Sequence, residues 1–527
     1  MRMIGSLPSF RFSRNPGMSL IGLFVVFWLA YQAAQLVLVG AVDTLIMAGM
    51  VFVGGAIVVA ILNDWRRGLF LFLGWVMFED LFRKYLGNNM AIFFAKDVLV
   101  LVVYLSFFIS RRAKRAIGFR PPFLVPLLIF IWIGVIQVFN PNSHSIFYGL
   151  LGMKVYFLYV PLMYVGYAFL ESDEDLRKLL TYNSILVILV AGLGIAQAII
   201  GPSFLNPHNL QEDIRDLATL YRKSPITGQI SYRPTSVFVS TGRFSNFVIV
   251  SWVLVLGFGG YLLLRSRRGR GIAFLSIAVV GIASIMSTSR SVFLWTASSA
   301  LVALAAFLWG APWRQGEVRR VLRTIQRTLL AAGLALLAMI TIFPEQIASR
   351  FALYSETLSP DSPASELVYR TRDYPLKNFL LAFDYDHWVT GYGIGTSSLG
   401  FQYVMRYFHP VPMNVLVENG YGQILLELGV PGLIAWIFLS VSIILSVWKV
   451  VKGLRQTPWF PIAFCIFWFA FLLLIPMSYI GFIAYQDYVM NAYLWLMLGI
   501  LFRLPDIAKQ ATLTQVAQMA PANSGQG

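Results

Sequence analysis

The chain has 527 residues, of which 58% are hydrophobic and only 12% are charged, and its mean hydropathy is +0.71. A soluble domain carries about 25% charged residues, so this composition excludes an ordinary soluble protein and indicates one that crosses a membrane many times. The net charge of +17 does not indicate nucleic-acid binding, because most of the excess cations lie in short loops between apolar runs.

Apolar runs that are long enough to cross a hydrocarbon core of about 30 Å recur along the chain and predict about fourteen transmembrane helices. A basic tail, 1–17, precedes the first run, which we interpret as a retained helix because no clear small-residue cleavage site follows it. The predicted helices are 18–38, 41–62, 67–82, 91–110, 121–139, 146–170, 179–201, 236–264, 271–288, 291–309, 328–345, 420–448, 459–479 and 487–503.

Two polar segments interrupt this series. The segment 202–235 separates the seventh and eighth helices, and the larger segment 346–419 separates helices one to eleven (18–345) from helices twelve to fourteen (420–503). Apolar residues at helical spacing predict an interfacial helix within each segment, at 209–223 and at 366–383. A small polar tail, 504–527, ends the sequence, and we assign it no function.

Basic clusters in alternate loops predict the orientation. With about fourteen spans and a cytoplasmic N-terminus, every dense cluster is cytoplasmic, both termini are cytoplasmic, and 346–419 is one large outer loop. The clusters are Arg11/Arg14, Arg66/Arg67, Arg111/Arg112/Lys114/Arg115, Arg265/Arg267/Arg268/Arg270, Arg319/Arg320/Arg323/Arg327 and Lys449/Lys452/Arg455.

Cations on the predicted outer side are exceptions to the rule that Lys and Arg collect in cytoplasmic loops. They are Arg83, Lys84, Lys96, Lys154, Arg215, Arg222, Lys223, Arg233, Arg243, Arg290, Arg350, Arg370, Arg372, Lys377 and Arg406. An ionisable group at membrane depth is costly unless it is paired, and pairing with outer acids is one interpretation. Four of these cations, Lys154, Arg233, Arg243 and Arg290, have no acid close by in sequence, so an anionic ligand is the simpler explanation for them. Arginine suits phosphate because its planar guanidinium binds two oxygens at once.

No metal-binding pattern is found. The histidines, His144, His208, His387 and His409, all fall on the predicted outer side, but they form no HxxxH, HxH or HExxH motif. The single cysteine, Cys465, excludes an intrachain disulfide and a site of several cysteines.

The sequence Gly-Tyr-Gly-Ile-Gly at 391–395 follows no strand of a βαβ unit, which argues against dinucleotide binding. Two interpretations stay open for it: a turn that lets the backbone approach a glycan or phosphate, or a plain tight turn. Thr288-Ser289-Arg290 stands where one apolar run ends and the next begins. It is either a hairpin with an N-cap serine or the place where Arg290 meets a lipid phosphate.

The end of the large loop resembles a signature of bacterial O-antigen ligases and polymerases. That signature is a His followed by Asn, Ser or Gln, nine residues, Gly, two residues and Gly. Here Glu418-Asn419 is followed by nine residues and then Gly429-Val430-Pro431-Gly432, and Tyr421 and Glu427 also match the family. The His of the family is therefore Glu418 in this chain.

Other segments extend the resemblance from about residue 80 to about residue 500. Ser289-Arg290 is similar to the Ser-Arg of the family, Arg370 to Gly395 is similar to its loop, and Arg233 matches the Arg before the next span. Leu81-Phe82-Arg83-Lys84-Tyr85 with Lys96-Asp97, and Gly149-Leu150-Leu151-Gly152-Met153-Lys154, look like segments of exopolysaccharide polymerases.

The resemblance implies an all-α polytopic integral membrane protein with a GT-C-like glycosyltransferase architecture, in the bacterial cytoplasmic (inner) membrane. The donor would be a glycan on undecaprenyl diphosphate, and the other partners would be membrane lipids and a chain-length regulator, with no nucleic acid. A sugar hydroxyl would attack the anomeric carbon with inversion, without a nucleotide, metal or other cofactor.

The resemblance and the outer cations together give the candidate site residues. Arg233, Arg290, Arg370 and Arg372 would bind the diphosphate, and Arg290, Arg370 and Glu418 would be catalytic. The remaining candidates for substrate binding are Arg83, Lys84, Lys154, Arg243, Gly393, Gly395, His409 and Asn419.

Glu418 is a departure from the family. The His of the family is thought to assist proton removal from the acceptor, and a carboxylate does the same work where partial burial raises its pKa. Because Glu418 lies where the polar loop meets an apolar helix, we expect its side chain to be partly buried. Three alternatives stay open: an acid that only complements the helix dipole, a base role taken by His409, or no base at all.

Three functions are weighed. A polysaccharide polymerase is favoured over an O-antigen ligase that transfers glycan to lipid A core, because of the span count and the upstream segments. A lipid-linked oligosaccharide flippase belongs to another class, but such transporters are usually built from repeated halves, whereas this chain has one asymmetric outer loop. A purely structural membrane protein would leave the outer cations unexplained.

Overall fold

A computed structural model describes residues 54–86, 90–110, 118–207, 220–265, 268–312, 340–397, 417–481 and 484–519, with single positions at 326, 330, 333, 334, 337, 338, 404, 405 and 415. The chain divides into two units, Met1–Asp64 and Trp65–Gly527. In the first unit, Gly54–Asn63 is a short apolar helix. All elements described next belong to the second unit.

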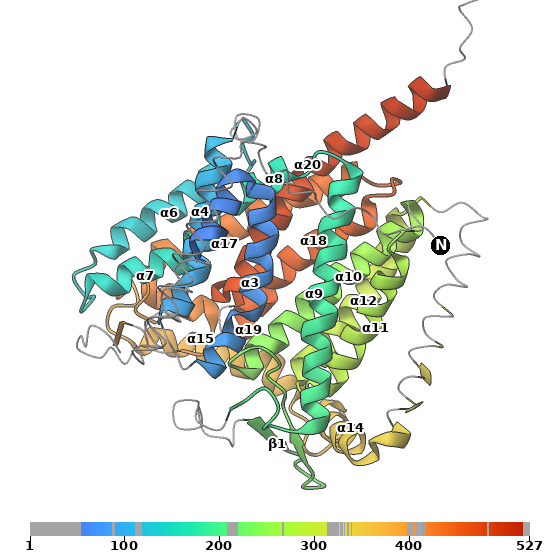
Figure 1. Ribbon diagram of the computed structural model, residues 1–527. Coiled ribbons are helices and arrows are strands. Elements are labelled where there is room, and N and C mark those ends of the chain that lie inside the picture. Colours follow the sequence, from blue (N-terminus) through green and yellow to red (C-terminus); the bar gives the residue numbers. More distant parts are fainter. Residues whose placement is uncertain are drawn as a thin grey trace, which may run out of the picture. The chain divides into compact units, whose positions relative to one another are not determined.

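The second unit is a helical bundle with one small hairpin (Figure 1). Its bundle helices are α3 (Trp65–Tyr85), α4 (Met90–Ile109), α6 (Leu124–Val138), α7 (Ile146–Phe157), α8 (Leu162–Phe169), α9 (Asp173–Ile200), α10 (Thr241–Arg265), α11 (Arg270–Met286), α12 (Arg290–Gly310), α17 (Gly420–Gly453), α18 (Phe460–Leu472), α19 (Ser478–Ile480) and α20 (Tyr488–Met519). The polar segments contribute β1 (Tyr221–Lys223), β2 (Ile230–Tyr232), α14 (Pro344–Leu358), α15 (Tyr374–Leu380), the π-helix η3 (Tyr369–Asp373) and the 3-10 helix η4 (Leu381–Asp384).

The prediction of an all-α membrane protein is confirmed. Among the described residues, eight helices are long and apolar enough to cross a membrane, and three shorter apolar helices accompany them. The predicted span 67–82 is helical as α3, but this helix carries acids and bases in its last two turns. The predicted span 18–38 lies outside the described residues, 41–62 lies largely outside them, and 328–345 lies partly outside them. The number of about fourteen therefore stays a prediction.

Helix α20 packs closely on α8 because two glycines remove the side chains between them. A Cβ atom at Gly166 would clash with the carbonyl oxygen of Leu496, and one at Gly499 would clash with that of Met163. Between transmembrane helices, such small residues allow the backbones to approach. The result is a tightly packed helix pair.

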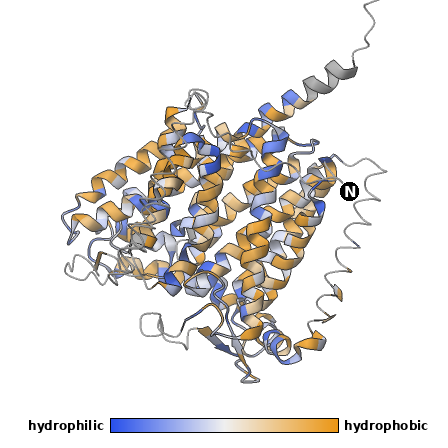
Figure 2. Ribbon diagram, in the orientation of Figure 1, coloured by the Kyte–Doolittle hydropathy of each residue, from blue (hydrophilic) through white to orange (hydrophobic). Residues whose placement is uncertain are grey.

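The two ends of the bundle differ in their polar contacts. At one end, Arg66 Nη2 lies 3.2 Å from Glu171 Oε2, and Arg265 Nε lies 3.2 Å from Asp173 Oδ2. The hairpin, α14 and α15 lie at the other end (Figure 1). Figure 2 shows mostly apolar residues along the bundle helices and more hydrophilic residues towards their ends. Segments predicted to be cytoplasmic and segments predicted to be outer thus lie at opposite ends.

Three predicted segments outside the apolar runs are compared with the structure: 366–383, 209–223 and the tail from 504. The interfacial helix predicted at 366–383 is confirmed in kind, since η3, α15 and η4 cover most of it. The helix predicted at 209–223 is wrong at its end, because Tyr221–Lys223 is a strand paired with β2; positions 209–219 lie outside the described residues. The tail predicted from 504 continues as helix, because α20 runs on to Met519.

Candidate functional site

Two arginines from distant segments meet at one carboxylate in the outer end of the bundle. Arg290 is the first residue of α12, and its Nη1 lies 2.9 Å from Glu366 Oε1. Arg370 lies one helical turn after Glu366, and its Nε lies 3.0 Å from Glu366 Oε2. Each oxygen of Glu366 therefore receives one guanidinium. Desolvation opposes the charge of Glu366, but the hydrogen bonds from Arg290 and Arg370 keep its pKa below the ordinary value.

Two more arginines, Arg222 of β1 and Arg233 directly after β2, lie close enough for their charges to act on this pair. Desolvation, together with the charges of Arg233, Arg290 and Arg370, lowers the pKa of Arg222 to about 9, which still leaves it protonated at neutral pH. Desolvation and then the charge of Arg290 likewise lower the pKa of Arg233. Like charges are being held together against their mutual repulsion. We call Arg222, Arg233, Arg290 and Arg370, with Glu366 bound by the last two, the arginine cluster.

The backbone beside the cluster is held in an unusual conformation. Thr288 has a φ of +55°, in the left-handed region, and its Oγ1 donates to the carbonyl oxygen of Tyr232 at 2.8 Å. Arg350 Nη2 donates to the same oxygen at 3.2 Å. Left-handed backbone at a residue other than glycine costs free energy and persists where surrounding contacts fix it. These contacts fix the residues next to Arg290 and Arg233 in place.

A second set of contacts links the cluster to Glu418. The guanidinium carbon of Arg370 lies 4.9 Å from the centre of the Tyr374 ring, and the Tyr374 hydroxyl donates a hydrogen bond to Glu418 Oε2. Arg370 belongs to η3, a π-helical turn of the kind that often occurs at functional sites. The structure therefore brings together Arg290, Arg370 and Glu418, the three residues predicted to be catalytic, through Glu366 and Tyr374.

The expected partial burial of Glu418 is wrong, because its side chain is exposed. The reason lies in the next residue. Asn419 is the N-cap of α17: its side chain accepts from the backbone N–H of Gly422 at 2.9 Å. Its amide nitrogen donates to the carbonyl oxygens of Pro375 and Tyr479 at 3.0 and 2.7 Å. Asn419 is thus buried and fully engaged, which explains its presence without substrate contact, and Glu418 remains outside the helix.

The glycines at 391–395 serve packing within the protein. Gly391, Gly393 and Gly395 all have positive φ, and Cβ atoms at Gly391 and Gly395 would clash with the backbones of α17 and α7, respectively. The Gly393 N–H donates to the carbonyl oxygen of Glu427 at 3.1 Å, beside the kink of α17 at Gly429. The candidates Gly393 and Gly395 are therefore buried against protein, and their conformation is explained by these contacts rather than by a ligand.

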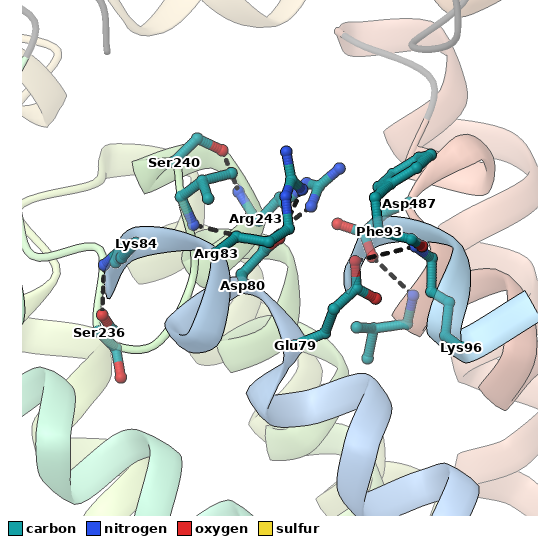
Figure 3. A network of polar contacts seen from close by, with 12 residues as sticks. Glu79, Asp80, Arg83, Lys84, Phe93, Lys96, Ser236, Ser240, Arg243 and Asp487 are labelled. Atoms are coloured by element: carbon teal, nitrogen blue, oxygen red, sulfur yellow. Dashed lines mark hydrogen bonds and ion pairs between the residues drawn. The ribbon is translucent and has the colours of Figure 1, made fainter. Parts of the chain in front are cut away.

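Four other candidates, Arg83, Lys84, Lys154 and Arg243, belong to a buried charge network of α3, α4, α7 and α10. Figure 3 shows Arg83, Lys84 and Arg243 of this network. Asp80 Oδ1 lies 2.9 Å from Arg83 Nη1, and Asp80 Oδ2 lies 2.7 Å from Arg243 Nη1. Lys154 Nζ lies 2.6 Å from Asp97 Oδ2. Lys154, Arg243 and Arg290 were singled out because no acid is near them in sequence, and in each case the fold supplies one.

The buried charge network also holds the segment that follows Arg233. Lys84 Nζ donates to Thr235 Oγ1 at 2.8 Å and to the carbonyl oxygen of Ser236 at 2.7 Å. Gln197 Oε1 accepts from the backbone N–H groups of the same two residues at 2.8 and 2.7 Å. Because the Lys84 ammonium is engaged by the protein itself, the contacts indicate a positioning role for it rather than direct substrate binding.

One predicted diphosphate-binding residue, Arg372, stands apart from the arginine cluster. Arg372 is paired with Asp373 at 2.7 Å, and 74% of its side chain is exposed. The structure thus gives Arg372 a partner outside the cluster. His409 lies outside the described residues.

Sequence reasoning missed Glu366, Tyr374 and the role of Arg222. Glu366 precedes Arg370 by four residues, a helical spacing at which opposite charges meet, and this signal was available. Tyr374 follows Arg370 at the same spacing. Arg222 had been noted only as one outer cation among many, because the strand pairing that carries it to Arg233 has no strong pattern in the sequence.

We expect Glu366→Gln to strengthen anion binding. Glu366 occupies the place between two arginines that an external anion would take, and glutamine keeps its size without its charge. Each partly exposed ion pair is worth under about 1 kcal/mol, so the dissociation constant for inorganic pyrophosphate should fall roughly two- to tenfold. Calorimetry on the purified protein measures it. Asp373→Asn, which removes an acid outside the cluster, is the control. Weaker binding by Glu366→Gln would show that Glu366 orders the arginines instead of competing with the anion.

No protein-family model matches this chain, and no curated protein matches it. The resemblance to O-antigen ligases and polymerases therefore rests on the motifs of this chain, and the function that it implies is a proposal.

Proposed function

We propose that the chain is a membrane glycosyltransferase. It transfers a glycan from undecaprenyl diphosphate to the hydroxyl of an acceptor sugar, on the outer face of the bacterial cytoplasmic membrane. The observation that carries this proposal is the arginine cluster beside Glu418: Arg290 and Arg370 share one carboxylate, the charges of Arg222 and Arg233 act on them, and Arg370 leads to an exposed acid through Tyr374. A diphosphate leaving group and a proton-accepting group are what this transfer requires.

In this glycosyl transfer, the arginine cluster and Glu418 have separate roles. The acceptor hydroxyl oxygen forms a new bond to the anomeric carbon while the bond from that carbon to the diphosphate oxygen breaks, with inversion. The electron pair of the broken bond stays on the lipid diphosphate, whose growing charge is stabilised by Arg290 and Arg370 with Arg222 and Arg233. The hydroxyl proton passes to the carboxylate of Glu418.

Polymerase activity is preferred over transfer to lipid A core. The upstream segments that look like those of exopolysaccharide polymerases lie together in the fold: Lys154 of one is paired with Asp97 of another, and Lys96 of that segment lies 2.9 Å from Glu79. These pairings also weigh against a flippase, because the buried cations at Arg83, Lys96, Lys154 and Arg243 have acid partners and require no transported anion to balance them.

The test is transfer by the purified protein in liposomes that contain lipid-linked repeat units. A polymerase should produce longer lipid-linked glycans and release one free undecaprenyl diphosphate for each new bond. A ligase should release the carrier only when lipid A core is added, and a flippase should move the donor without breaking a bond. Donor that stays intact with every acceptor would refute the glycosyltransferase proposal.

A further inference from the structure

A cavity of about 620 Å³ lies at the outer end of the bundle, apart from the arginine cluster. Its walls are the C-terminal end of α9, the β-hairpin and the first two turns of α14, which lie near one another in Figure 1. Cavities that hold small molecules usually measure about 300–1,000 Å³. The volume is therefore large enough for a short oligosaccharide.

The hairpin borders both this cavity and the arginine cluster. Tyr221 and Tyr232 are partners in the strand register, their ring centres lie 5.6 Å apart, and both line the cavity. Arg222, the neighbour of Tyr221, lies among the arginines, and its strand partner Ser231 lines the cavity. A ligand in the cavity would thus lie beside the proposed diphosphate site.

Hydrogen-bonding groups in the cavity wall are open to a ligand. The side chains of Gln229, Glu345 and Gln346 line the cavity and have no hydrogen bond or ion pair with any residue that the structure describes. Amide groups both donate and accept, and a carboxylate accepts, so the three side chains match the hydroxyl groups of a sugar. The tyrosine pair supplies apolar ring surface for its C–H groups.

The charge of the cavity argues against an anionic ligand. Arg350 lies in the wall, but its guanidinium donates to the carbonyl oxygens of Met286, Tyr232 and Gln346. Glu345 adds a negative charge that offsets the charge of Arg350, so the wall has no net positive charge to attract a phosphate. An acyl chain would leave the open amide and carboxylate groups without partners.

We infer that this cavity binds a sugar unit of the glycan chain during transfer, as a subsite next to the reaction centre. The inference rests on the proposed glycosyltransferase function and names the substrate class for a second place in the molecule. The hairpin then has a part in both sites: Arg222 on the diphosphate side and Tyr221 with Tyr232 on the sugar side.

The experiment fills the cavity without removing a contact. Ala348 is exposed in the cavity wall, and Ala348→Trp would occupy the space. The matched control is Ser355→Trp, an exposed position on the same helix that does not line the cavity. The probe is neutral oligosaccharide released by mild acid from the cell's own lipid-linked glycan pool. Its binding to the purified protein is measured by saturation-transfer NMR and calorimetry, with pyrophosphate binding measured in parallel.

We expect Ala348→Trp, and also Tyr221→Ala, to weaken oligosaccharide binding at least about tenfold, a loss of roughly 1.4 kcal/mol. Pyrophosphate binding by both variants and all binding by Ser355→Trp should stay as in the wild type. Unchanged oligosaccharide binding in Ala348→Trp, or equal loss in Ser355→Trp, would overturn the inference. Because this readout is binding, it is independent of the liposome transfer assay, so a protein that binds the sugar yet transfers none would refute only the proposed function.

Discussion

Replacing Arg290 by alanine is expected to reduce glycan transfer by about a hundred- to a thousandfold, the usual effect of removing one donor that stabilises charge in a transition state. Arg290 is the residue through which α12 reaches the cluster, and only 13% of its side chain is exposed. Its loss removes a guanidinium from the leaving diphosphate. The measurement is the initial rate of release of free undecaprenyl diphosphate in the liposome assay.

Two further variants decide what Arg290 contributes. Arg290→Lys keeps the charge but loses the planar fork that binds two oxygens, so its rate should also be low. Arg372→Ala is the matched control, because Arg372 carries the same guanidinium group two residues from Arg370 but is exposed and paired with Asp373. Its rate should stay within a few-fold of wild type. A wild-type rate from Arg290→Lys, or an equal loss from Arg372→Ala, would contradict a bidentate clamp at Arg290.

The helices were predictable because their signal is local. A long apolar run predicts a membrane-crossing helix wherever it lies in the chain. The helices α9, α10, α12 and α18 accordingly lie close to the predicted spans. The kink of α17 was not predicted. It depends on Gly429, whose positive φ lets residues 389–393 dock against the helix, with the Val430 N–H donating to the carbonyl oxygen of Val389 at 3.0 Å. Such a docking joins segments that are far apart in sequence.

The candidate site was predicted in part, for the same reason. The sorting of charges along the chain picked out Arg233 and Arg290, because neither has an acid close by in sequence, and the resemblance to the family picked out Arg370. The sorting also picked out Arg243, whose partner Asp80 is 163 residues away, so that no sequence pattern shows the pairing. Burial of charge is costly without a partner, and the fold supplies Arg243 with Asp80, whereas Arg290 and Arg370 share the single carboxylate of Glu366.

Two roles are considered for Glu418, and they predict effects of very different size when it is replaced. An acid at the start of a helix complements the helix dipole, and this interaction is worth under about 1 kcal/mol. A general base contributes about a hundred- to ten-thousandfold in rate. The structure separates the two roles by position: Asn419 caps α17, whereas the carboxylate of Glu418 accepts a hydrogen bond from Tyr374 beside Arg370. Desolvation and then the bond to Glu418 raise the pKa of Tyr374, so the phenol stays protonated and leaves proton acceptance to the carboxylate.

Glu418→Gln should therefore slow transfer by about a hundredfold or more, since an amide oxygen still accepts from Tyr374 but takes no proton. The rate of carrier release with purified lipid-linked repeat units measures this, and pyrophosphate binding should be unchanged because the arginine cluster is intact. Tyr374→Phe is the control: it removes the hydrogen bond and keeps the carboxylate, so its loss should be much smaller. Glu418→His, which restores the residue of the similar family, should recover part of the rate. If Glu418→Gln instead turns over within a few-fold of wild type, Glu418 is not the base, and His409 is the residue to replace next.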